Sequence, residues 1–297
     1  MVQLDILDDQ QKQLKILSYG AGQDSSVLIH KMINELDAIV FSDTGNEHPH
    51  TYETVERAQK FAESHGVKFI RLNTADEYHN PSWPSLTGQW DRNSSVQLAR
   101  SKACTDGLKI TPIYKWLNDF CGELLGVDKS DRQDRGKPHI VEYAKQHGKI
   151  QMMIGIAKGE EKRVGKDFPN KWANDSIERV YPLIENEMGR NECQVYLKSV
   201  EETLGTVWPS NCMFCHFQSK QELLWLHRNH PEDFSRWVEY EAAKIEKYAH
   251  KEKNHGVYGK KLLLEKLADA IAEFGDWSDE RLDEYKFSHG HCVTNAY

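Results

Sequence analysis

Ser18-Tyr19-Gly20-Ala21-Gly22-Gln23-Asp24-Ser25 is the stretch of sequence that decides the fold. The apolar residues 14–17 before it predict a short buried strand, and a helical pattern follows over residues 25–35. Between strand and helix, glycines let backbone N–H groups approach an anion closely, and the start of the helix adds partial positive charge. The hydroxyls of Ser18 and Ser25 can donate further hydrogen bonds. The stretch therefore predicts a phosphate-binding turn.

Other interpretations of this turn are open. A Walker A loop needs a lysine where Asp24 stands, so that interpretation is poor. A dinucleotide-binding fingerprint is nearly matched by Gly20-x-Gly22-x-x-Ser25, with Asp43 as the ribose ligand, although its third glycine is missing. A glycine-rich connection without any ligand is the remaining alternative.

The rest of the chain predicts an α/β fold. Apolar runs at residues 38–41, 67–72 and 151–156 read as strands, and a helix is expected from Pro49 to about residue 65. This alternation is typical of a doubly wound parallel sheet. From residue 181 onward the pattern is mostly helical, which predicts a nucleotide-binding domain over residues 1–180 and a helical region with a cysteine-rich site over residues 181–297.

Residues 74–101 differ from this pattern, because prolines and tryptophans stand among polar residues. They predict a long surface excursion over the active site. In it, Trp83 and Trp90 either stack on a base or pack beneath the loop.

Composition narrows the class of protein. The chain has 297 residues and a formal net charge of −8, which argues against a generally basic, sequence-blind nucleic-acid binder. No apolar stretch has the length of a membrane span, and residues 1–14 do not read as a signal peptide, so a cytoplasmic protein is expected. In such a protein, clustered cysteines indicate metal or redox chemistry. The six are Cys104, Cys121, Cys193, Cys212, Cys215 and Cys292.

The opening stretch resembles the pyrophosphate loop of the PP-loop superfamily, Ser-x-Gly-x-x-Asp-Ser, with an extra spacer. That superfamily includes ATP pyrophosphatases, tRNA thiolation enzymes and phosphoadenosine phosphosulfate (PAPS) reductases. The resemblance implies an adenine-nucleotide α-hydrolase type of fold. It also implies a phosphate site made of Ser18, Gly20, Gly22, Gln23, Asp24 and Ser25.

A second stretch, residues 41–52, resembles the Asp-Thr-Gly-x-x-x-Pro-x-Thr segment of PAPS reductases, which implies nucleotide binding by Asp43, Thr44 and Gly45. By itself the segment is compatible with a plain helix entry. Asp24 and Asp43 could also hold Mg²⁺ together with phosphates, because this ion prefers oxygen ligands. Asp43 is equally compatible with a structural cap.

Two further segments extend the resemblance. Lys102-Ala103-Cys104-Thr105-x-x-x-Lys109 is similar to a segment of adenylylsulfate reductases that carries cluster cysteines and a substrate-binding lysine, with Thr105 in place of a second cysteine. This favours Lys109 as an anion contact over a solvated position on a helix. Residues 155–163 look like the family's Gly-Ile-Arg segment, but Ala157 replaces the arginine. Arg163 or Lys158 is the expected substitute, for a phosphate or a nucleic-acid backbone.

The cysteines predict a metal centre. Cys212-x-x-Cys215 lets two thiolates bind one metal, and Cys193, together with Cys104 as the resemblance implies, completes four. Four thiolates suit a [4Fe–4S] cluster or zinc; the spacing does not separate them, and the resemblance favours iron–sulfur. Cysteines without any metal are the remaining alternative. His216 is expected at the surface, with metal ligation as its alternative.

Residues 210–217 closely resemble a Ser-x-Cys-x-Phe-Cys-Pro-Phe segment of a PAPS-reductase-like branch common in bacteria and their viruses, and residues 188–193 fit the same branch. Cys121 reads as a buried apolar residue. Cys292 matches only loosely the nucleophilic cysteine near the C-terminus of the reductases. It is predicted to be a nucleophile or sulfur carrier, a tail residue without a role, or a metal ligand with the neighbouring histidines.

Three hypotheses follow. The first is a PAPS-reductase-like enzyme that cleaves ATP to AMP and pyrophosphate and supports sulfur transfer from a donor to a nucleotide or nucleic acid, with Asp24, Lys109 and Cys292 as catalytic residues. The second is a PAPS or adenylylsulfate reductase, in which Cys292 attacks the sulfonate sulfur and a thioredoxin-like partner resolves the product. The third is a nucleotide-sensing module without turnover. An oligomer is compatible with all three.

Overall fold

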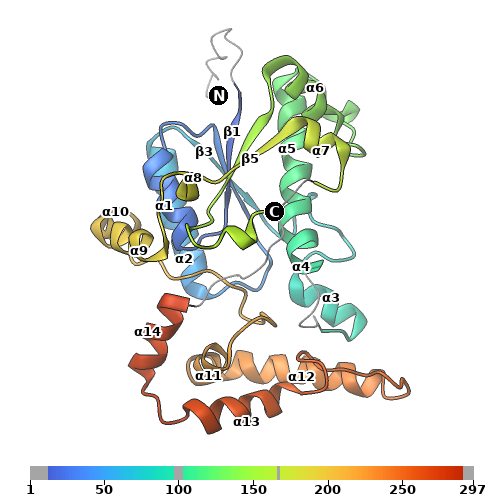
Figure 1. The fold of residues 1–297 in the computed structure, drawn as a ribbon. Coiled ribbons are helices and arrows are strands. Elements are labelled where there is room, and N and C mark those ends of the chain that lie inside the picture. The colour runs from blue at the N-terminus through green and yellow to red at the C-terminus, as the bar shows by residue number, and fades with distance from the viewer. Residues whose placement is uncertain (1–12, 97–102, 166–167, 290–297) are drawn as a thin grey trace.

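The computed structural model describes residues 13–96, 103–165 and 168–289. Figure 1 shows a central sheet between helices, with a further group of helices below it. The sheet has five parallel strands in the order β3-β2-β1-β4-β5. They are β1 (Lys15–Tyr19), β2 (Ala38–Ser42), β3 (Lys68–Leu72), β4 (Ile150–Ile154) and β5 (Ile177–Val180). The predicted doubly wound parallel fold is confirmed.

The strand order places a crevice beside β1. The chain moves outward from β1 to β2 and β3 on one side, and to β4 and β5 on the other. In open α/β sheets, ligands bind where the order reverses, at the carboxyl ends of the strands. The segments after Tyr19 and Ile154 are therefore the ones that this fold presents to a ligand.

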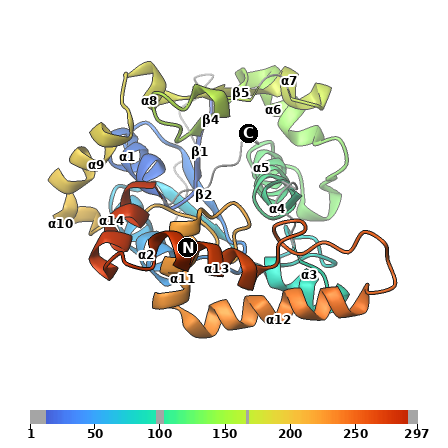
Figure 2. The ribbon, with the colours of Figure 1, turned by 60° about the horizontal axis from the view of Figure 1, so that its bottom comes forward.

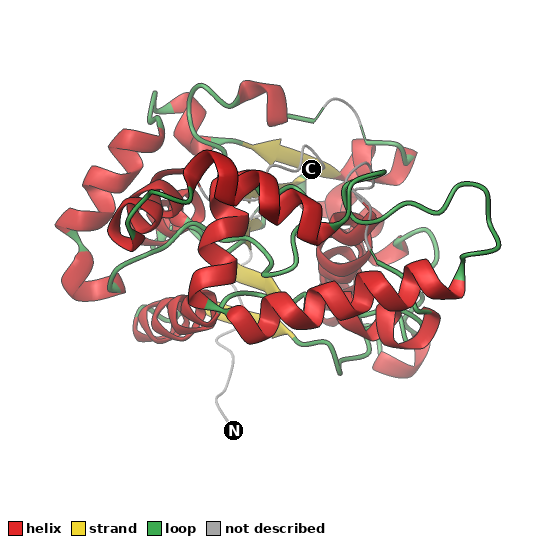
Figure 3. Cartoon of the chain, turned by 90° about the horizontal axis from the view of Figure 1, so that it is seen from below, coloured by secondary structure: helices red, strands yellow, loops and turns green. Residues whose placement is uncertain are grey.

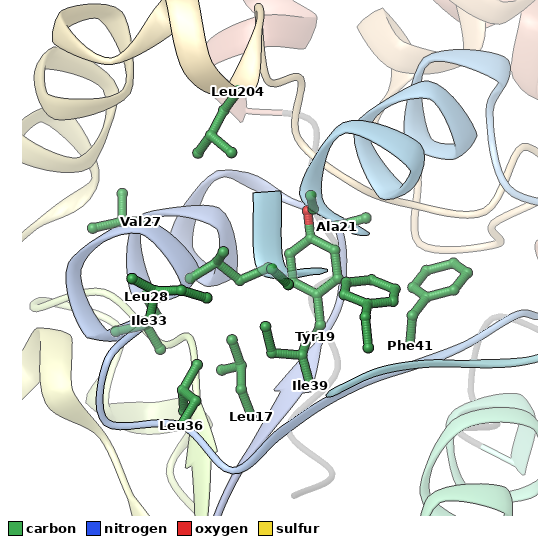
Figure 4. Close-up of a cluster of buried hydrophobic side chains, with 14 of the residues drawn as sticks. Leu17, Tyr19, Ala21, Val27, Leu28, Ile33, Leu36, Ile39, Phe41 and Leu204 are labelled. Carbon is green, nitrogen blue, oxygen red and sulfur yellow. The ribbon is translucent and has the colours of Figure 1, made fainter. Parts of the chain in front are cut away.

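Both faces of the sheet are covered, because side chains alternate along a strand. Leu17 and Ile39 belong to one apolar cluster, while Ile16 and Val40 belong to another. Figure 4 shows part of the first cluster around Tyr19. That face packs against α1 (Gln23–Met32), α2 (Pro49–Ser64), α8 (Pro182–Glu185), α9 (Arg190–Ser199) and α10 (Glu201–Leu204). The second face packs against α5 (Thr111–Leu124), α6 (Pro138–His147) and α7 (Lys171–Ser176).

The remaining helices either are short segments or belong to the lower group, away from the two faces of the sheet. The short α4 (Ala103–Thr105) and a π-helical stretch (Asp106–Ile110) lead into α5. Single turns of 3₁₀ helix lie at Lys129–Asp131 and Glu161–Arg163. The lower group contains α11 (Lys220–Asn229), α12 (Pro231–Lys247), α13 (Leu263–Phe274) and α14 (Asp279–His289). Figure 2 shows these four helices in front of the sheet when the bottom of the molecule is turned toward the viewer, and Figure 3 shows the molecule from below.

The lower helices share a third apolar cluster with α3 (Leu86–Asn93). In it the Trp90 and Trp237 rings each stack on the Phe214 ring, with centroid distances of 6.0 Å and 5.5 Å. Trp90 is 1% exposed, so the expected surface excursion contains a helix that anchors it. Of the alternatives for Trp90, packing beneath the loop is therefore the one observed.

Several elements were not predicted from the sequence, among them α6, β5 and α14. β5 carries Glu178 and Arg179 in its centre, so this edge strand lacks the apolar run that predicts a strand. α14 is polar and buries only Leu282 and Lys286, so it lacks the apolar periodicity of a surface helix. The boundary near residue 180 stays a prediction; α8 to α10, which follow it, pack with the sheet in the first apolar cluster. Within the described residues, no helix has the length and apolar character needed to cross a membrane.

Candidate functional site

The predicted phosphate loop lines a pocket at the carboxyl end of β1. Its lining residues from the loop are Ser18, Gly20, Gly22, Gln23, Asp24 and Ser25. The Ser25 hydroxyl lies inside the loop, where it accepts a hydrogen bond from the Gly20 N–H at 3.3 Å and donates one to the Gly22 carbonyl at 3.2 Å. The loop therefore places backbone amides and hydroxyls around one small space at the start of α1.

Close backbone contacts hold this loop. A Cβ atom on Gly155, just after β4, would lie 2.7 Å from the Ser25 nitrogen. A Cβ atom on Gly22 would lie 2.7 Å from Ser210 Oγ and 3.2 Å from its backbone nitrogen. Glycine is thus required at position 155, a side chain at position 22 would displace Ser210, and Ser210 belongs to the wall of the pocket.

Three cationic side chains line the pocket: Lys109, Arg163 and Arg190. The first two were predicted as anion contacts. Arg190, the first residue of α9, was not, although it lies in the segment 188–193 that fits the bacterial and viral branch. Its signal was a glycine followed by arginine at a helix start, which is too common to identify an anion site by itself.

Carboxylates hold these cations. Glu160 bridges two of them: its Oε2 lies 2.5 Å from Arg163 Nη1, and its Oε1 accepts a hydrogen bond from Arg190 Nη2. Arg190 Nη2 also lies 3.9 Å from Asp24 Oδ2, and Lys109 Nζ lies 3.2 Å from Glu47 Oε1. Each cation of the pocket therefore already has an anionic partner.

Burial and charge act in opposite directions on the carboxyls. Burial raises the pKa of Asp24, and the charge of Arg190 opposes this effect. Burial would likewise raise the pKa of Glu160, but the hydrogen bond and charge of Arg190 and the charge of Arg163 hold it below its usual value. Glu160 is thus ionised and paired with both arginines, while burial at the loop disfavours the charged form of Asp24.

The second nucleotide-binding motif lies next to a different cavity. Asp43 Oδ1 accepts hydrogen bonds from the Gly45 N–H at 2.8 Å and the Tyr52 hydroxyl at 2.9 Å, so this carboxylate closes a turn. Thr44 lines a pocket with three of the predicted metal ligands, Cys104, Cys212 and Cys215. We call this second cavity the thiol pocket.

Cys212 makes polar contacts on the floor of the thiol pocket. Its Sγ lies 3.4 Å from Thr44 Oγ1 and 3.6 Å from Glu47 Oε1. Burial raises the pKa of the Cys212 thiol well above its usual value, and the charge of Glu47 adds to this effect. Without a bound cation, this cysteine is therefore a protonated thiol.

The phosphate pocket and the thiol pocket share a wall. Thr105 and Lys109 line both of them. Lys109 lies in the π-helical stretch before α5, a type of irregularity found often at functional sites. The Glu47–Lys109 ion pair therefore links the phosphate pocket to the contacts of Cys212.

A segment that we call the strap, residues 209–217, also spans both pockets. Ser210 touches the phosphate loop, and Cys212 pairs with Glu47 in an isolated β-bridge. The Met213 N–H then donates to the Asn46 carbonyl at 2.7 Å. The strap fixes the predicted cysteine motif against the Asp-Thr-Gly turn.

The structure places Cys193 apart from this arrangement. Cys193 is fully buried in the first apolar cluster on α9, where burial raises its pKa to about 12. Cys292 lies outside the described residues. Cys121 is buried, as predicted.

His216 corrects one expectation. It was expected at the surface, but it is 3% exposed and lines the thiol pocket, because its neighbours in the strap, Cys215 and Phe217, line the same pocket. As placed, the described residues contain no group of three histidine, cysteine or acidic side chains that could hold a metal ion.

Comparison with known proteins identifies the family. The profile of the phosphoadenosine phosphosulfate reductase domain matches residues 15–199, more than half of the chain. No curated protein and no solved structure matches the chain. The matched range contains the phosphate loop and the three cations of its pocket, and it ends before the strap; the narrower branch suggested by the strap stays a prediction. The chain belongs to the phosphoadenosine phosphosulfate reductase family.

Proposed function

We propose that this chain binds an adenine nucleotide on the phosphate loop, cleaves ATP to AMP and pyrophosphate while activating a substrate as an adenylate, and supports sulfur transfer to a nucleotide or nucleic acid. The observation that carries this proposal is the wall of Thr105 and Lys109 between the phosphate pocket and the thiol pocket. An adenylate formed in the first pocket would lie next to the sulfur chemistry of the second.

The phosphate pocket suits a leaving pyrophosphate. Amides at the start of α1 and the Ser18 and Ser25 hydroxyls would bind its oxygens. Lys109, Arg163 and Arg190 would stabilise the negative charge that develops as the bond to the leaving group breaks.

Asp24 fits a role as a Mg²⁺ ligand. Its Oδ1 is buried and has no hydrogen-bond partner within the described part of the chain. A hard cation satisfies such an oxygen, and bound Mg²⁺ would polarise the phosphate oxygens. Asp43 fits this role less well, because its carboxylate already closes a turn.

The thiol pocket fits an iron–sulfur cluster or zinc in donor chemistry. Cys104, Cys212, Cys215 and His216 all line it, and these are donors that both centres accept. A cluster held there would supply redox or sulfur chemistry. We place Cys193 outside this ligand set, because it lies in another apolar cluster.

Pyrophosphate release from Mg·ATP, with candidate nucleic-acid acceptors and a sulfide donor, tests the proposal. Asp24→Asn should abolish release, while Asp131→Asn, an exposed change away from the pocket, should preserve it. Persistent ATP binding without pyrophosphate release under all conditions would instead favour a nucleotide sensor.

One observation favours reduction of PAPS or adenylylsulfate as a second candidate. Gln23 Nε2 of the phosphate loop donates to the Phe287 carbonyl at 3.3 Å, close to the end of α14. Cys292 is the fifth residue after Phe287, and five residues of chain span at most about 17 Å. The Cys292 thiolate could therefore attack a sulfonate bound at the loop. Sulfite release from PAPS in the presence of a thioredoxin-like reductant, lost in Cys292→Ser, tests this candidate.

A further inference from the structure

Glu160 occupies the position between the two arginines of the phosphate pocket. One carboxylate oxygen contacts Arg163 Nη1 and the other contacts Arg190 Nη2. Two backbone contacts bring these segments together: Lys158 pairs with Gly189 in a β-bridge, and the Lys158 N–H donates to the Met188 carbonyl at 2.7 Å. The carboxylate is thus held where two guanidinium groups meet.

This pairing leaves donor capacity unused. Arg163 Nε is buried and has no hydrogen-bond partner within the described ranges. A guanidinium binds an oxyanion best through two parallel N–H···O bonds. Glu160 engages Arg163 through Nη1 and leaves Nε without a partner among the described residues, so a phosphate or sulfonate group with three oxygens could satisfy Nε as well.

The charges of the phosphate pocket also indicate that an anionic ligand must replace a contact already present or bring its own cation. Lys109, Arg163 and Arg190 are each paired with a carboxylate, so a polyanion meets cations that are already neutralised. Binding must then either bring a cation or release a carboxylate from its partners.

Glu160 is the carboxylate best placed to leave. Asp24 is fixed within α1, and Glu47 is 3% exposed beneath the strap. Glu160 lies instead in the turn after β4, directly after Gly159 at φ +91°, and its side chain is 19% exposed. A glycine in the left-handed region can change conformation without the steric restriction of a Cβ atom.

We propose that Glu160 is a resident counter-ion of Arg163 and Arg190, which the pyrophosphate group of the incoming nucleotide displaces. This inference rests on the proposed function, because it assigns the pocket to a pyrophosphate-bearing ligand. Glu160 lowers the affinity of the empty pocket for small monoanions, which cannot replace both of its contacts. A pyrophosphate offers enough oxygens to hold both arginines and the loop amides together.

Binding of inorganic pyrophosphate with Mg²⁺, measured by calorimetry, tests the inference. Glu160→Gln keeps the size of the side chain and removes the charge, so pyrophosphate should bind at least about tenfold more tightly than to the wild type. Glu187→Gln is the matched control: it removes the same charge from an exposed pair with Lys158, and affinity should not change. Arg163→Met added to Glu160→Gln should remove the gain.

The outcomes separate the inference from the proposed function. If the wild type binds pyrophosphate and Glu160→Gln binds it equally or more weakly, Glu160 is not a displaced counter-ion, and the proposed function stands. If neither protein binds pyrophosphate, both proposals are wrong. Should Glu160→Gln not fold, Glu160→Asp, which withdraws the carboxylate by one methylene, should also tighten binding; unchanged or weaker binding there overturns the inference.

Discussion

The phosphate pocket and the thiol pocket share a wall but have opposite chemistry. The first is lined by paired ions and by backbone at close range. The second has apolar walls, including Leu86 and Leu108, and a Cys212 thiol whose pKa is raised by burial. This difference supports binding of a charged ligand in the phosphate pocket and of a soft metal or sulfur centre in the thiol pocket.

The two pockets also depend on one support. Lys286 of α14 is 1% exposed, and its Nζ donates to Asn211 Oδ1 at 2.6 Å and lies 3.4 Å from Glu222 Oε1. Asn211 stands in the strap between Ser210, which touches the phosphate loop, and Cys212. A change at Lys286 should therefore disturb both pockets, whereas a change within one pocket should affect that pocket alone.

The largest expected effect follows from Lys286→Met. It leaves the Glu222 carboxylate buried without its cation, so the free energy of unfolding in urea should fall by about 4 kcal/mol. Adding Glu222→Gln should restore part of the loss. The control Lys220→Met, which breaks a more exposed pair with Glu273, should cost less than about 1 kcal/mol. An unchanged stability of Lys286→Met would show that the strap does not need this ion pair.

Acid should distinguish the region under the strap from the phosphate pocket. Burial, with the charge of Lys286, lowers the pKa of His50 to about 4, against about 6.5 in the unfolded chain. Between these values the unfolded chain binds a proton that the folded chain does not, so stability falls as pH falls. The loss should approach about 3 kcal/mol at pH 4.

Acid changes stability in the opposite direction through Asp24. Burial raises the pKa of Asp24 in the folded chain, so its protonation in acid favours the folded state.

Other histidines lie close to His50 and are included in the test. His48 stacks on His50, His230 lies beside His48, and burial lowers the pKa of His48 as well. Urea unfolding of His50→Asn between pH 7 and pH 4 should show a flatter pH dependence than the wild type, while exposed His65→Asn should not. Equal slopes would remove His50 as the cause.

The shared wall gives the next prediction. Lys109→Met removes a cation from the phosphate pocket, and pyrophosphate release should fall about 100-fold. Lys129→Met, which breaks an exposed pair with Glu77, should leave the rate unchanged. A wild-type rate in Lys109→Met would mean that this lysine only holds Glu47, and that the wall separates the pockets without serving the reaction.

The two pockets were not equally predictable from the sequence. The phosphate loop could be predicted because strand, glycines and helix follow one another, and backbone geometry determines where their amides point. The clamp of Glu160, Arg163 and Arg190 could not, because a contact across 30 residues leaves no local pattern. Lys286 was missed for another reason: a charged residue on a polar helix predicts exposure, and only tertiary packing buries it.

The cysteines show the same limit, and they give the smallest expected effect on stability. Cys212-x-x-Cys215 was readable as a pair, but the sequence could not choose their partners. In the structure, Cys104 lies in their pocket, while Cys193 lies in the first apolar cluster on α9. Cys193→Ala should lower the free energy of unfolding by only about 1 kcal/mol, through lost packing.

Iron, sulfide and zinc per chain, measured after purification without oxygen, complete this comparison. Cys212→Ala should reduce the bound metal to background, and Cys193→Ala should leave it unchanged, because the thiol pocket keeps its three cysteines and His216. Equal metal loss in both variants would return Cys193 to the ligand set and require α9 to approach the strap. A wild-type protein without iron or zinc would instead leave the thiol pocket as an apolar cavity, and sulfur transfer would then need another carrier.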